Sequence, residues 1–371
     1  MNVARDFAAF WTAGDLTLQG RLADAYGAPG VAAVAALFGP GVYSPFWYPP
    51  TALLIWLPFA LMPFAVAAAL WIAGSGLAYA MAIRKVAGGG LILALAFPSV
   101  LICGLYGQNS LFSAALLGAA AVTLGRHPVV AGVLLGCLAY KPQLAMLAPL
   151  TLMLAGRWQA FSSAAVTVVT LIAASVLAFG VEPWLAFIGN LPAGKAWFAD
   201  GVPGYDKFAS PYAALRLLGS TDTAAWTVQA IAAVAAILGL IWIARQRPGG
   251  AAEVSAMVVT SGLCVPSLGE YDLVILIVPA AWLAAEAARN GWLPYERITL
   301  AGLYVMPLAI KVAAMHGVPL APAAVVTLAL LVGRRVHRTR GLIEHQVDNR
   351  LGRAMQVIVS MIFLTRKNQR P

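Results

Sequence analysis

Long apolar runs separated by short charged connections dominate the chain. With His counted as neutral, no charged residue occurs in the stretches 86–125, 158–181, 223–244 and 312–333. A membrane-spanning helix needs about 20 apolar residues, so each stretch is long enough for one or two crossings. The pattern predicts eleven membrane-spanning helices, several of them short, at about 64–83, 91–106, 110–125, 128–140, 143–156, 159–179, 224–244, 252–267, 272–288, 298–315 and 318–333.

The segment before these helices has a different pattern. Residues 1–50 lack the basic, apolar and small-residue order of a signal peptide and are predicted to form a polar, aromatic first loop. Residues 51–61 would supply about 16 Å of helix, too little to cross a hydrocarbon core of about 30 Å. Because Pro63 follows them, we expect them to form the outer part of a long, proline-kinked helix.

The remaining segments complete the predicted domain plan. Residues 181–223 are predicted to be a second long loop, so that a single membrane domain occupies residues 1–340. Residues 341–371 would then be a cytoplasmic or interfacial tail. Their apolar run at 355–364 is too short for a span and favours an interfacial helix.

Composition supports a membrane protein. Of the 371 residues, 61% are apolar and 10% are charged, and the mean hydropathy is +0.83, whereas soluble domains are about 25% charged. The net charge of +10 does not indicate a nucleic-acid partner, because the basic residues form short groups between apolar runs and not a continuous basic face. We expect a membrane-embedded chain that binds no nucleic acid; its oligomeric state stays open.

Lys and Arg occur in alternate connections, which orients the chain. One set of short connections carries Arg84, Lys85, Arg126, Arg157, Arg245, Arg247, Arg289, Arg297, Arg334, Arg335, Arg338 and Arg340. Such connections face the cytoplasm, so the other set is predicted to lie outside the cytoplasm, with the protein in the inner (plasma) membrane. Nine of the 14 acidic residues lie in that second set: Asp6, Asp15, Asp24, Glu182, Asp200, Asp206, Asp222, Glu270 and Asp272.

Four polar motifs lie in these predicted extracytoplasmic connections. The first loop begins with Arg5-Asp6-Phe7 and ends in Phe46-Trp47-Tyr48-Pro49-Pro50; then come Gly107-Gln108-Asn109-Ser110, Lys141-Pro142-Gln143 and Tyr271-Asp272-Leu273. In this order the motifs resemble glycosyltransferase family 87. That family comprises membrane enzymes of the GT-C class, including polyprenyl-phosphate-mannose-dependent α-mannosyltransferases. The resemblance covers the chain to about residue 335.

The resemblance implies an all-α, GT-C-like bundle that transfers a sugar outside the cytoplasm. The donor would be a polyprenyl-phosphate-linked sugar, with mannose expected, and the acceptor a lipid or glycan hydroxyl, with inversion at the sugar. In this class an acid in the first extracytoplasmic loop, soon after the first helix, acts as the base, and Asp6 matches that position. Only five residues precede Asp6, so either the start codon is placed too late or the first helix is missing.

The chemistry of the transfer also requires a carboxylate base. Asp6 is the predicted base, and Asp15, nine residues further on, is the alternative. Either acid could instead cap a loop helix or be simply solvated.

Lys141 interrupts a run that is otherwise free of charge from 127 to 156. An ionisable residue at membrane depth costs about 2.5–3.5 kcal/mol on insertion scales and normally has a partner or a task. We predict that Lys141 binds the donor phosphate, with Gln143 as a neighbouring hydrogen-bond donor. The alternative is a lysine at the end of a span that reaches toward the interface.

The two other motifs are candidates for binding the sugar or the acceptor. Gln108 and Asn109 occupy a tight turn, where they could hold sugar hydroxyls or cap helix ends. Tyr271 and Asp272 open a span, and Asp272 could equally be a helix N-cap. Arg216, Lys311 and His316 are further cations or histidines on this side, for which an interfacial role is the simpler interpretation.

No cofactor is expected besides the donor substrate. Cys103, Cys137 and Cys264 lack CxxC spacing, and no metal-binding motif stands out, so the predicted reaction needs neither a metal nor another cofactor. Two other functions compete: a transporter or lipid flippase, and an inactive homologue. A transporter would place polar groups at mid-membrane and along both faces, whereas the sequence places them on one side.

Overall fold

In this computed structural model, residues 3–39 and 44–339 are described. Within those ranges every regular element is a helix, and a single β-bridge pairs Phe208 with Gly269. The predicted all-α class is therefore confirmed. The predicted tail 341–371, with its interfacial helix at 355–364, lies outside the described residues.

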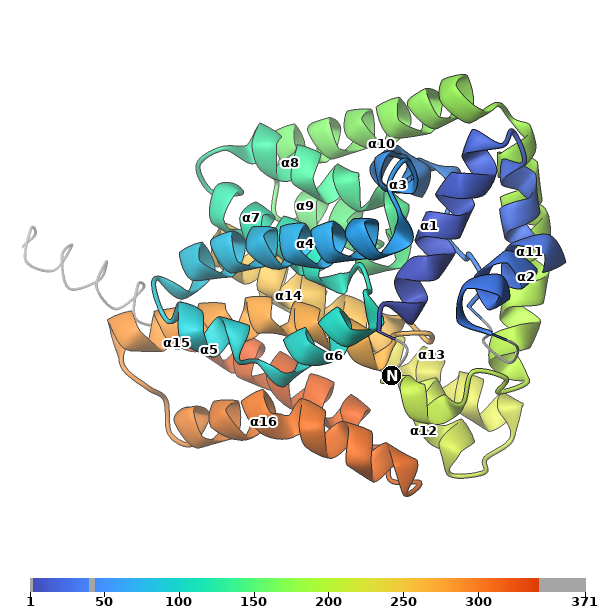
Figure 1. Cartoon of the computed structure of the whole chain (residues 1–371). Helices are drawn as coiled ribbons and strands as arrows, with labels where there is room; N and C mark the ends of the chain where they lie inside the picture. The colour runs from blue at the N-terminus through green and yellow to red at the C-terminus, as the bar shows by residue number, and fades with distance from the viewer. Residues whose placement is uncertain (1–2, 40–43, 340–371) are drawn as a thin grey trace, which may run out of the picture.

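The first predicted loop is itself helical. It contains α1 (Arg5–Leu18), η1 (Leu22–Tyr26) and α2 (Ala28–Phe38), and it is followed by η2 (Pro50–Ala52) and α3 (Leu53–Ala60). Helix α1 packs against α3 through aromatic side chains, and the Phe10 and Trp56 rings stack with their centroids 4.0 Å apart. Figure 1 shows α1 and α2 at the same end of the molecule as α11 (Glu182–Ala199).

The predicted long, proline-kinked helix is wrong. Helix α3 ends at Ala60, and α4 (Phe64–Ala87) begins only after Pro63, whose ψ of 139° is incompatible with a continuous helix. The helical backbone conformation is disfavoured for the residue that precedes a proline, whereas prolines are common where helices begin. Pro63 therefore separates two helices. Figure 1 shows α3 nearly end-on and α4 lying across the view.

A bundle of helices follows α4. Its first half comprises α5 (Leu91–Leu95), α6 (Pro98–Tyr106), α7 (Ser110–Thr123), α8 (Pro128–Gly136), η3 (Cys137–Tyr140), η4 (Pro142–Leu144), α9 (Ala148–Leu154) and α10 (Trp158–Phe179). After α11 come η5 (Tyr205–Lys207), α12 (Pro211–Leu217), α13 (Asp222–Arg245), α14 (Gly250–Cys264), η6 (Glu270–Leu276), α15 (Ile277–Asn290), α16 (Glu296–Met315) and a helix over 321–339. The second predicted loop, 181–223, thus contains α11, η5 and α12.

Five helices in the described part of the chain are long and apolar enough to cross a membrane. They are α4, α10, α13, η6 with α15, and α16. The predicted span 318–333 corresponds to the helix over 321–339, and the remaining predicted spans contain only short helices; α7, with 14 residues, is about 21 Å long. The chain is therefore an all-α, multi-pass membrane protein, and the predicted count of about eleven spans is not confirmed.

Helices α8 and α10 pack closely because α8 carries two glycines one turn apart. A Cβ on Gly132 would lie 2.2 Å from the carbonyl oxygen of Ala160, and one on Gly136 would lie 2.8 Å from that of Ala164. Small residues at this spacing let two helix backbones approach each other in membranes. This contact fixes α10 against the segment that leads into the Lys141 loop.

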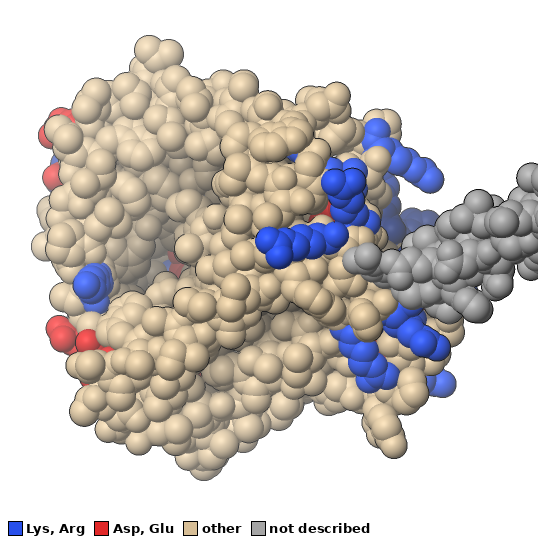
Figure 2. All heavy atoms as spheres, turned by 180° about the vertical axis from the view of Figure 1, so that it is seen from behind, with Lys and Arg blue, Asp and Glu red and all other residues tan. Residues whose placement is uncertain are grey.

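Charge is distributed unevenly between the two ends of the molecule. Figure 2 shows most of the visible Lys and Arg side chains at the right edge and most of the visible acidic ones at the left edge. The same face is hollowed in its left half, and charged atoms are visible inside the hollow. A functional site is therefore expected at the end that carries most of the visible acidic residues.

Candidate functional site

Four connections that are far apart in the sequence meet in one polar cluster. They are the start of α1, the turn between α6 and α7, the loop between η3 and η4, and the start of η6. The polar cluster consists of Asp6, Gln108, Asn109, Ser110, Lys141 and Asp272, joined by hydrogen bonds. Five of these six residues are ones that the sequence predicts as site residues, and Ser110 belongs to a quoted motif.

Asp6 lies in the first turn of α1, with 15% of its side chain exposed. Gln108 Nε2 donates a hydrogen bond of 2.9 Å to Asp6 Oδ2, and Arg5 Nε lies 3.7 Å from Asp6 Oδ1. Burial raises the pKa of the Asp6 carboxyl, and the Gln108 hydrogen bond and the charges of Arg5 and Lys207 oppose this effect without cancelling it. A carboxylate with a raised pKa is a stronger base, so this environment suits proton abstraction.

The turn at Gly107 explains how Gln108 reaches Asp6. Gly107 has a φ of +68°, and a Cβ there would lie 2.9 Å from Phe7 Cβ. The adjacent backbone is tied to the start of α1, because Ala4 N donates a 2.8 Å hydrogen bond to Leu105 O. Only glycine accommodates both the left-handed conformation and the close approach. The α6–α7 turn is therefore fixed against the start of α1.

Lys141 is buried, with 2% of its side chain exposed, and forms an ion pair with Asp272. Its ammonium also donates to Asn109 Oδ1 at 3.1 Å and to Ser110 Oγ at 3.3 Å. All three N–H groups of the ammonium thus have acceptors within the polar cluster. The ammonium holds three chain segments together and gives the cluster a fixed positive charge.

Asp272 is not the helix N-cap that the sequence offered as an alternative, because the N-cap is Gly269 and Asp272 is the third residue of η6. Its Oδ2 accepts a 3.3 Å hydrogen bond from Gly269 N, as an acid in the first turn of a capped helix does. Its Oδ1 accepts from Lys141 and from the Ser110 hydroxyl. The preceding Tyr271 places its ring 5.4 Å from the Lys141 ammonium. Asp272 therefore both supports the start of η6 and belongs to the cluster.

A second group of charged residues adjoins the polar cluster. Glu270 is 5% exposed; its Oε1 accepts from Lys311 at 2.9 Å and from the Tyr106 hydroxyl at 3.4 Å. The Arg5 guanidinium lies 5.8 Å from the centre of the Tyr106 ring and connects this group to Asp6. Sequence reasoning did not single out Glu270 or Arg5 as site residues. The signal available was their position directly beside Tyr271 and Asp6.

The segment 181–223 also reaches the cluster. Phe208 pairs with Gly269 in the β-bridge, and Ala209 N donates a 2.7 Å hydrogen bond to Leu268 O. This contact brings the charge of Lys207 close enough to influence Asp6. The second predicted loop therefore borders the site.

Some predicted candidates lie elsewhere. Asp15 is at the far end of α1 and accepts a hydrogen bond from Gln19 at 2.8 Å; nine residues of helix place it about 13 Å along the axis from Asp6. Gln143 is half-buried in η4 and takes no part in the hydrogen bonds of the cluster. Arg216 bonds to Tyr205 and the Ser220 carbonyl, and His316 is exposed.

An apolar groove of about 590 Å³ runs between α8, α9, α10 and α11. Its walls include Trp184, Phe187 and aliphatic side chains of α10. Its lining also includes Pro49 and Pro142, the residues that directly follow Tyr48 and Lys141. Such walls suit a hydrocarbon chain, and the groove borders the loop between η3 and η4, which carries Lys141.

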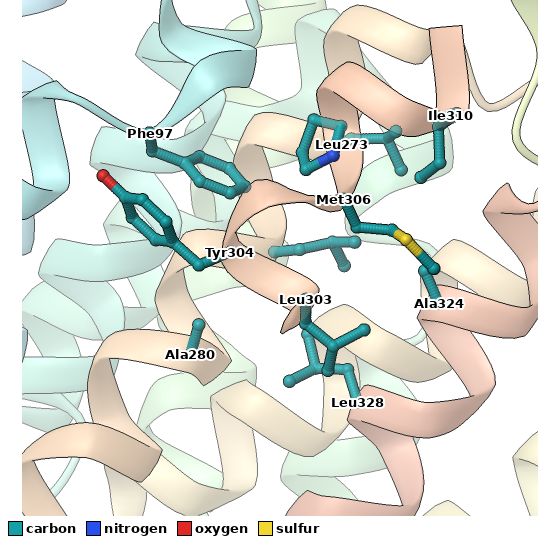
Figure 3. Close-up of a pocket in the computed structure, with 11 residues that line it drawn as sticks. Phe97, Leu273, Ala280, Leu303, Tyr304, Met306, Ile310, Ala324 and Leu328 are labelled. Atoms are coloured by element: carbon teal, nitrogen blue, oxygen red, sulfur yellow. The ribbon is translucent and has the colours of Figure 1, made fainter. Parts of the chain in front are cut away.

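A second cavity lies beneath α16 (Figure 3) and has a volume of only about 30 Å³. Figure 3 shows Phe97, Leu273, Met306 and Ile310 among the side chains around it. It is too small for a sugar and is lined almost entirely by apolar atoms, so it is a packing defect and not a substrate site.

The groups of the cluster suit acid–base chemistry, and the described residues do not form a metal site. The described residues contain no group of three or more His, Cys, Asp or Glu that could hold a metal ion. The arrangement provides a largely buried carboxylate on Asp6, a fixed cation on Lys141 that is linked to it through Asn109 and Gln108, and further amide and hydroxyl groups.

The chain matches the model of a known protein family. The model of glycosyltransferase family 87 matches residues 46–267, more than half of the chain. The matched range contains Gln108, Asn109 and Lys141, and it leaves out Asp6 and Asp272. No curated protein and no solved structure matches the chain.

Proposed function

Given that the chain belongs to glycosyltransferase family 87, we propose that it transfers a sugar, with mannose expected, from a polyprenyl phosphate to a hydroxyl of a lipid or glycan. The family implies the glycosyltransferase activity. The lipid-linked donor, the inversion and the role of Asp6 are the parts that we propose. The observation that carries them is a largely buried carboxylate within a polar cluster whose Lys141 loop borders an apolar groove.

Asp6 acts as the base in this proposal. As the acceptor oxygen forms its bond to the anomeric carbon, its proton moves to Asp6. The bond between that carbon and the phosphate oxygen breaks, and its electron pair leaves with the phosphate. An inverting displacement places the base across the sugar from the leaving group, as in inverting glycosidases. Gln108 keeps the carboxylate oriented, because it donates to Oδ2.

The apolar groove supports a lipid-linked donor. A hydrocarbon chain lying between α8, α9 and α10 would bring its phosphate end to the loops at Pro49 and Pro142. We assign the phosphate to this end, where Lys141 supplies the positive charge that a leaving phosphate needs. Because the ammonium is already bonded to Asp272, Asn109 and Ser110, the phosphate either replaces one of these partners or lies just beyond them. Gln143, two residues along, is a further donor for it.

The charge distribution supports an extracytoplasmic site. Most of the visible Lys and Arg side chains lie at the end opposite most of the visible acidic ones, and basic connections favour the cytoplasmic side of a membrane. We therefore place the polar cluster on the extracytoplasmic side of the inner (plasma) membrane.

The donor can be tested with the purified full chain in lipid nanodiscs. We expect label to pass from radiolabelled polyprenyl-phosphate mannose to a glycolipid in an added extract of membrane lipids. A matched donor with a chain of only two isoprene units should show a higher KM, because it leaves most of the groove unfilled. Transfer from a nucleoside-diphosphate mannose, or equal KM values for the two chain lengths, would contradict the proposal.

A further inference from the structure

Two buried polar atoms, in side chains that both contact Tyr106, have no hydrogen-bond partner among the residues that the structure describes. One is Oε2 of Glu270, whose other oxygen accepts from Lys311 and Tyr106. The other is Nε of Arg5, which lies at ion-pair distance from Asp6 without a hydrogen bond to it. Leaving a buried polar group unpaired costs about 1–3 kcal/mol, and more for a charged group. The Glu270 oxygen therefore points to a ligand, and the Arg5 nitrogen, 3.7 Å from Asp6 Oδ1, is placed to donate to the same ligand.

The two atoms lie around one aromatic ring. Tyr106 receives the Arg5 guanidinium over its face and donates its hydroxyl to Glu270. The ring of Tyr271 lies next to it, with centroids 6.3 Å apart. A ligand held here would meet a hydrogen-bond acceptor on Glu270, a donor on Arg5 and the rings of Tyr106 and Tyr271. Arg5 directly precedes Asp6, the proposed base, in the sequence.

We propose that Arg5, Tyr106 and Glu270 form a subsite for the hydroxyls of a sugar unit in the acceptor. A sugar hydroxyl both donates and accepts, so it can pair with the Glu270 oxygen and with the Arg5 nitrogen. The sugar face can lie against the tyrosine rings. The acceptor presented to Asp6 is then a saccharide headgroup, and not a simple lipid alcohol. This inference rests on the function proposed above and names the class of its acceptor.

Other ligands fit this place less well. A phosphate would meet the Glu270 carboxylate, a negative charge buried to 95% and held by Lys311. A metal ion would need at least one further acidic, His or Cys ligand, and the described residues supply no such group of three. A neutral polyol satisfies both unpaired atoms without adding charge.

The test compares acceptors with the full chain in nanodiscs free of glycoside detergents. Hexyl α-mannoside, below its micelle concentration, is the sugar acceptor, hexanol is the alcohol control, and radiolabelled polyprenyl-phosphate mannose is the donor. We expect transfer to the glycoside and little to hexanol. Glu270→Gln should raise the KM for the glycoside about 10- to 100-fold, the value for losing a hydrogen bond to a charged group. Its kcat and the KM for the donor should change less than about twofold.

Matched variants separate a subsite from a general defect. Glu286→Gln changes a glutamate that pairs with Arg289 at the opposite end of α15 and should leave both KM values unchanged. Tyr106→Phe keeps the ring but removes the hydroxyl that contacts Glu270, so a rise in KM is expected here as well. This variant decides the question if Glu270→Gln does not fold, as judged by thermal unfolding.

The failure of this inference can be distinguished from that of the proposed function. If the wild type transfers sugar but neither variant changes the KM for the glycoside, the subsite is wrong and the proposed function stands. If the wild type transfers nothing from the lipid donor, the proposed function is wrong. Equilibrium binding of radiolabelled hexyl α-mannoside then tests the subsite: weaker binding in Glu270→Gln supports it, and equal or absent binding overturns it.

Discussion

The side-chain amide of Gln108 donates a 2.9 Å hydrogen bond to the carboxylate of Asp6, although 102 positions separate the two residues. The bond joins the turn between α6 and α7 to the first turn of α1. Because it stabilises the charged carboxylate, it lowers the pKa of Asp6 against the larger effect of burial. It thereby links the orientation of the proposed base to its protonation.

Gln108→Leu should shift the pH dependence of sugar transfer. Without the hydrogen bond, the pKa of Asp6 rises further, so the acidic limb of kcat/KM against pH moves to higher pH. We also expect a fall in kcat of about tenfold at neutral pH, because a bond to a charged group is worth about 1.5–3 kcal/mol. Gln19→Leu removes the equivalent bond to Asp15 and is the matched control, with an unchanged profile. An unshifted limb in Gln108→Leu would show that Asp6 is not the titrating group.

Asp6→Asn should stabilise the protein at neutral pH. The pKa of Asp6 is raised in the folded state above its ordinary value of 3.8, mainly by burial. The stability that this carboxyl contributes is therefore present below about pH 4 and is lost as the pH rises through the raised pKa. The unfolding temperature of the Asn variant should be higher than that of the wild type at pH 7. The difference between the two unfolding temperatures should shrink as the pH falls. An Asn variant that unfolds below the wild type at pH 7 would contradict the raised pKa.

The buried pair of Lys141 and Asp272 should be costly to break. Lys141→Met should lower the free energy of unfolding by about 3–5 kcal/mol, since it leaves the Asp272 charge buried and unpaired. Adding Asp272→Leu should recover much of that loss without restoring transfer. The exposed pair of Arg21 and Asp24 is the control, and Arg21→Met should cost less than about 1 kcal/mol. The free energy of unfolding can be measured in mixed micelles. A loss of less than about 1 kcal/mol in Lys141→Met would show that the pair is accessible to water.

The contact between α8 and α10 should not accept a larger residue. Gly132→Ala places a methyl group against the Ala160 carbonyl and should destabilise by about 1–3 kcal/mol. Gly74→Ala in α4 meets open space and should stabilise by about 0.5–1 kcal/mol. The two unfolding temperatures should therefore move in opposite directions. Equal shifts would show that the helices are not in close contact at Gly132.

Much of the candidate site could be predicted from the sequence, because polar residues are conspicuous among apolar ones. Lys141, Gln108 and Asp272 each interrupt or border a long apolar stretch, and the structure brings them together. Their chemical roles are still predictions. Glu270 was harder to recognise, because its importance depends on Tyr106 and on Lys311, which are distant in the sequence.

The fold was predictable in class but not in detail. Apolar runs indicate helices within a membrane, yet their length alone does not separate one crossing from two short helices. Pro63 divides α3 from α4, and Pro98 begins α6 after the short α5. Whether a proline kinks a helix or ends it depends on the packing around it, here that of α1 on α3, which hydropathy does not record.

The most direct test of the account is sugar transfer by Asp6→Asn from radiolabelled polyprenyl-phosphate mannose, with Asp15→Asn as the control on the same helix. The substitution keeps the shape of the side chain and removes the base. We predict that Asp6→Asn lowers kcat about 10²–10⁴-fold while the variant stays folded, and that Asp15→Asn transfers at the wild-type rate. Full activity in Asp6→Asn, or loss of activity only in Asp15→Asn, would contradict the assignment of Asp6 as the base.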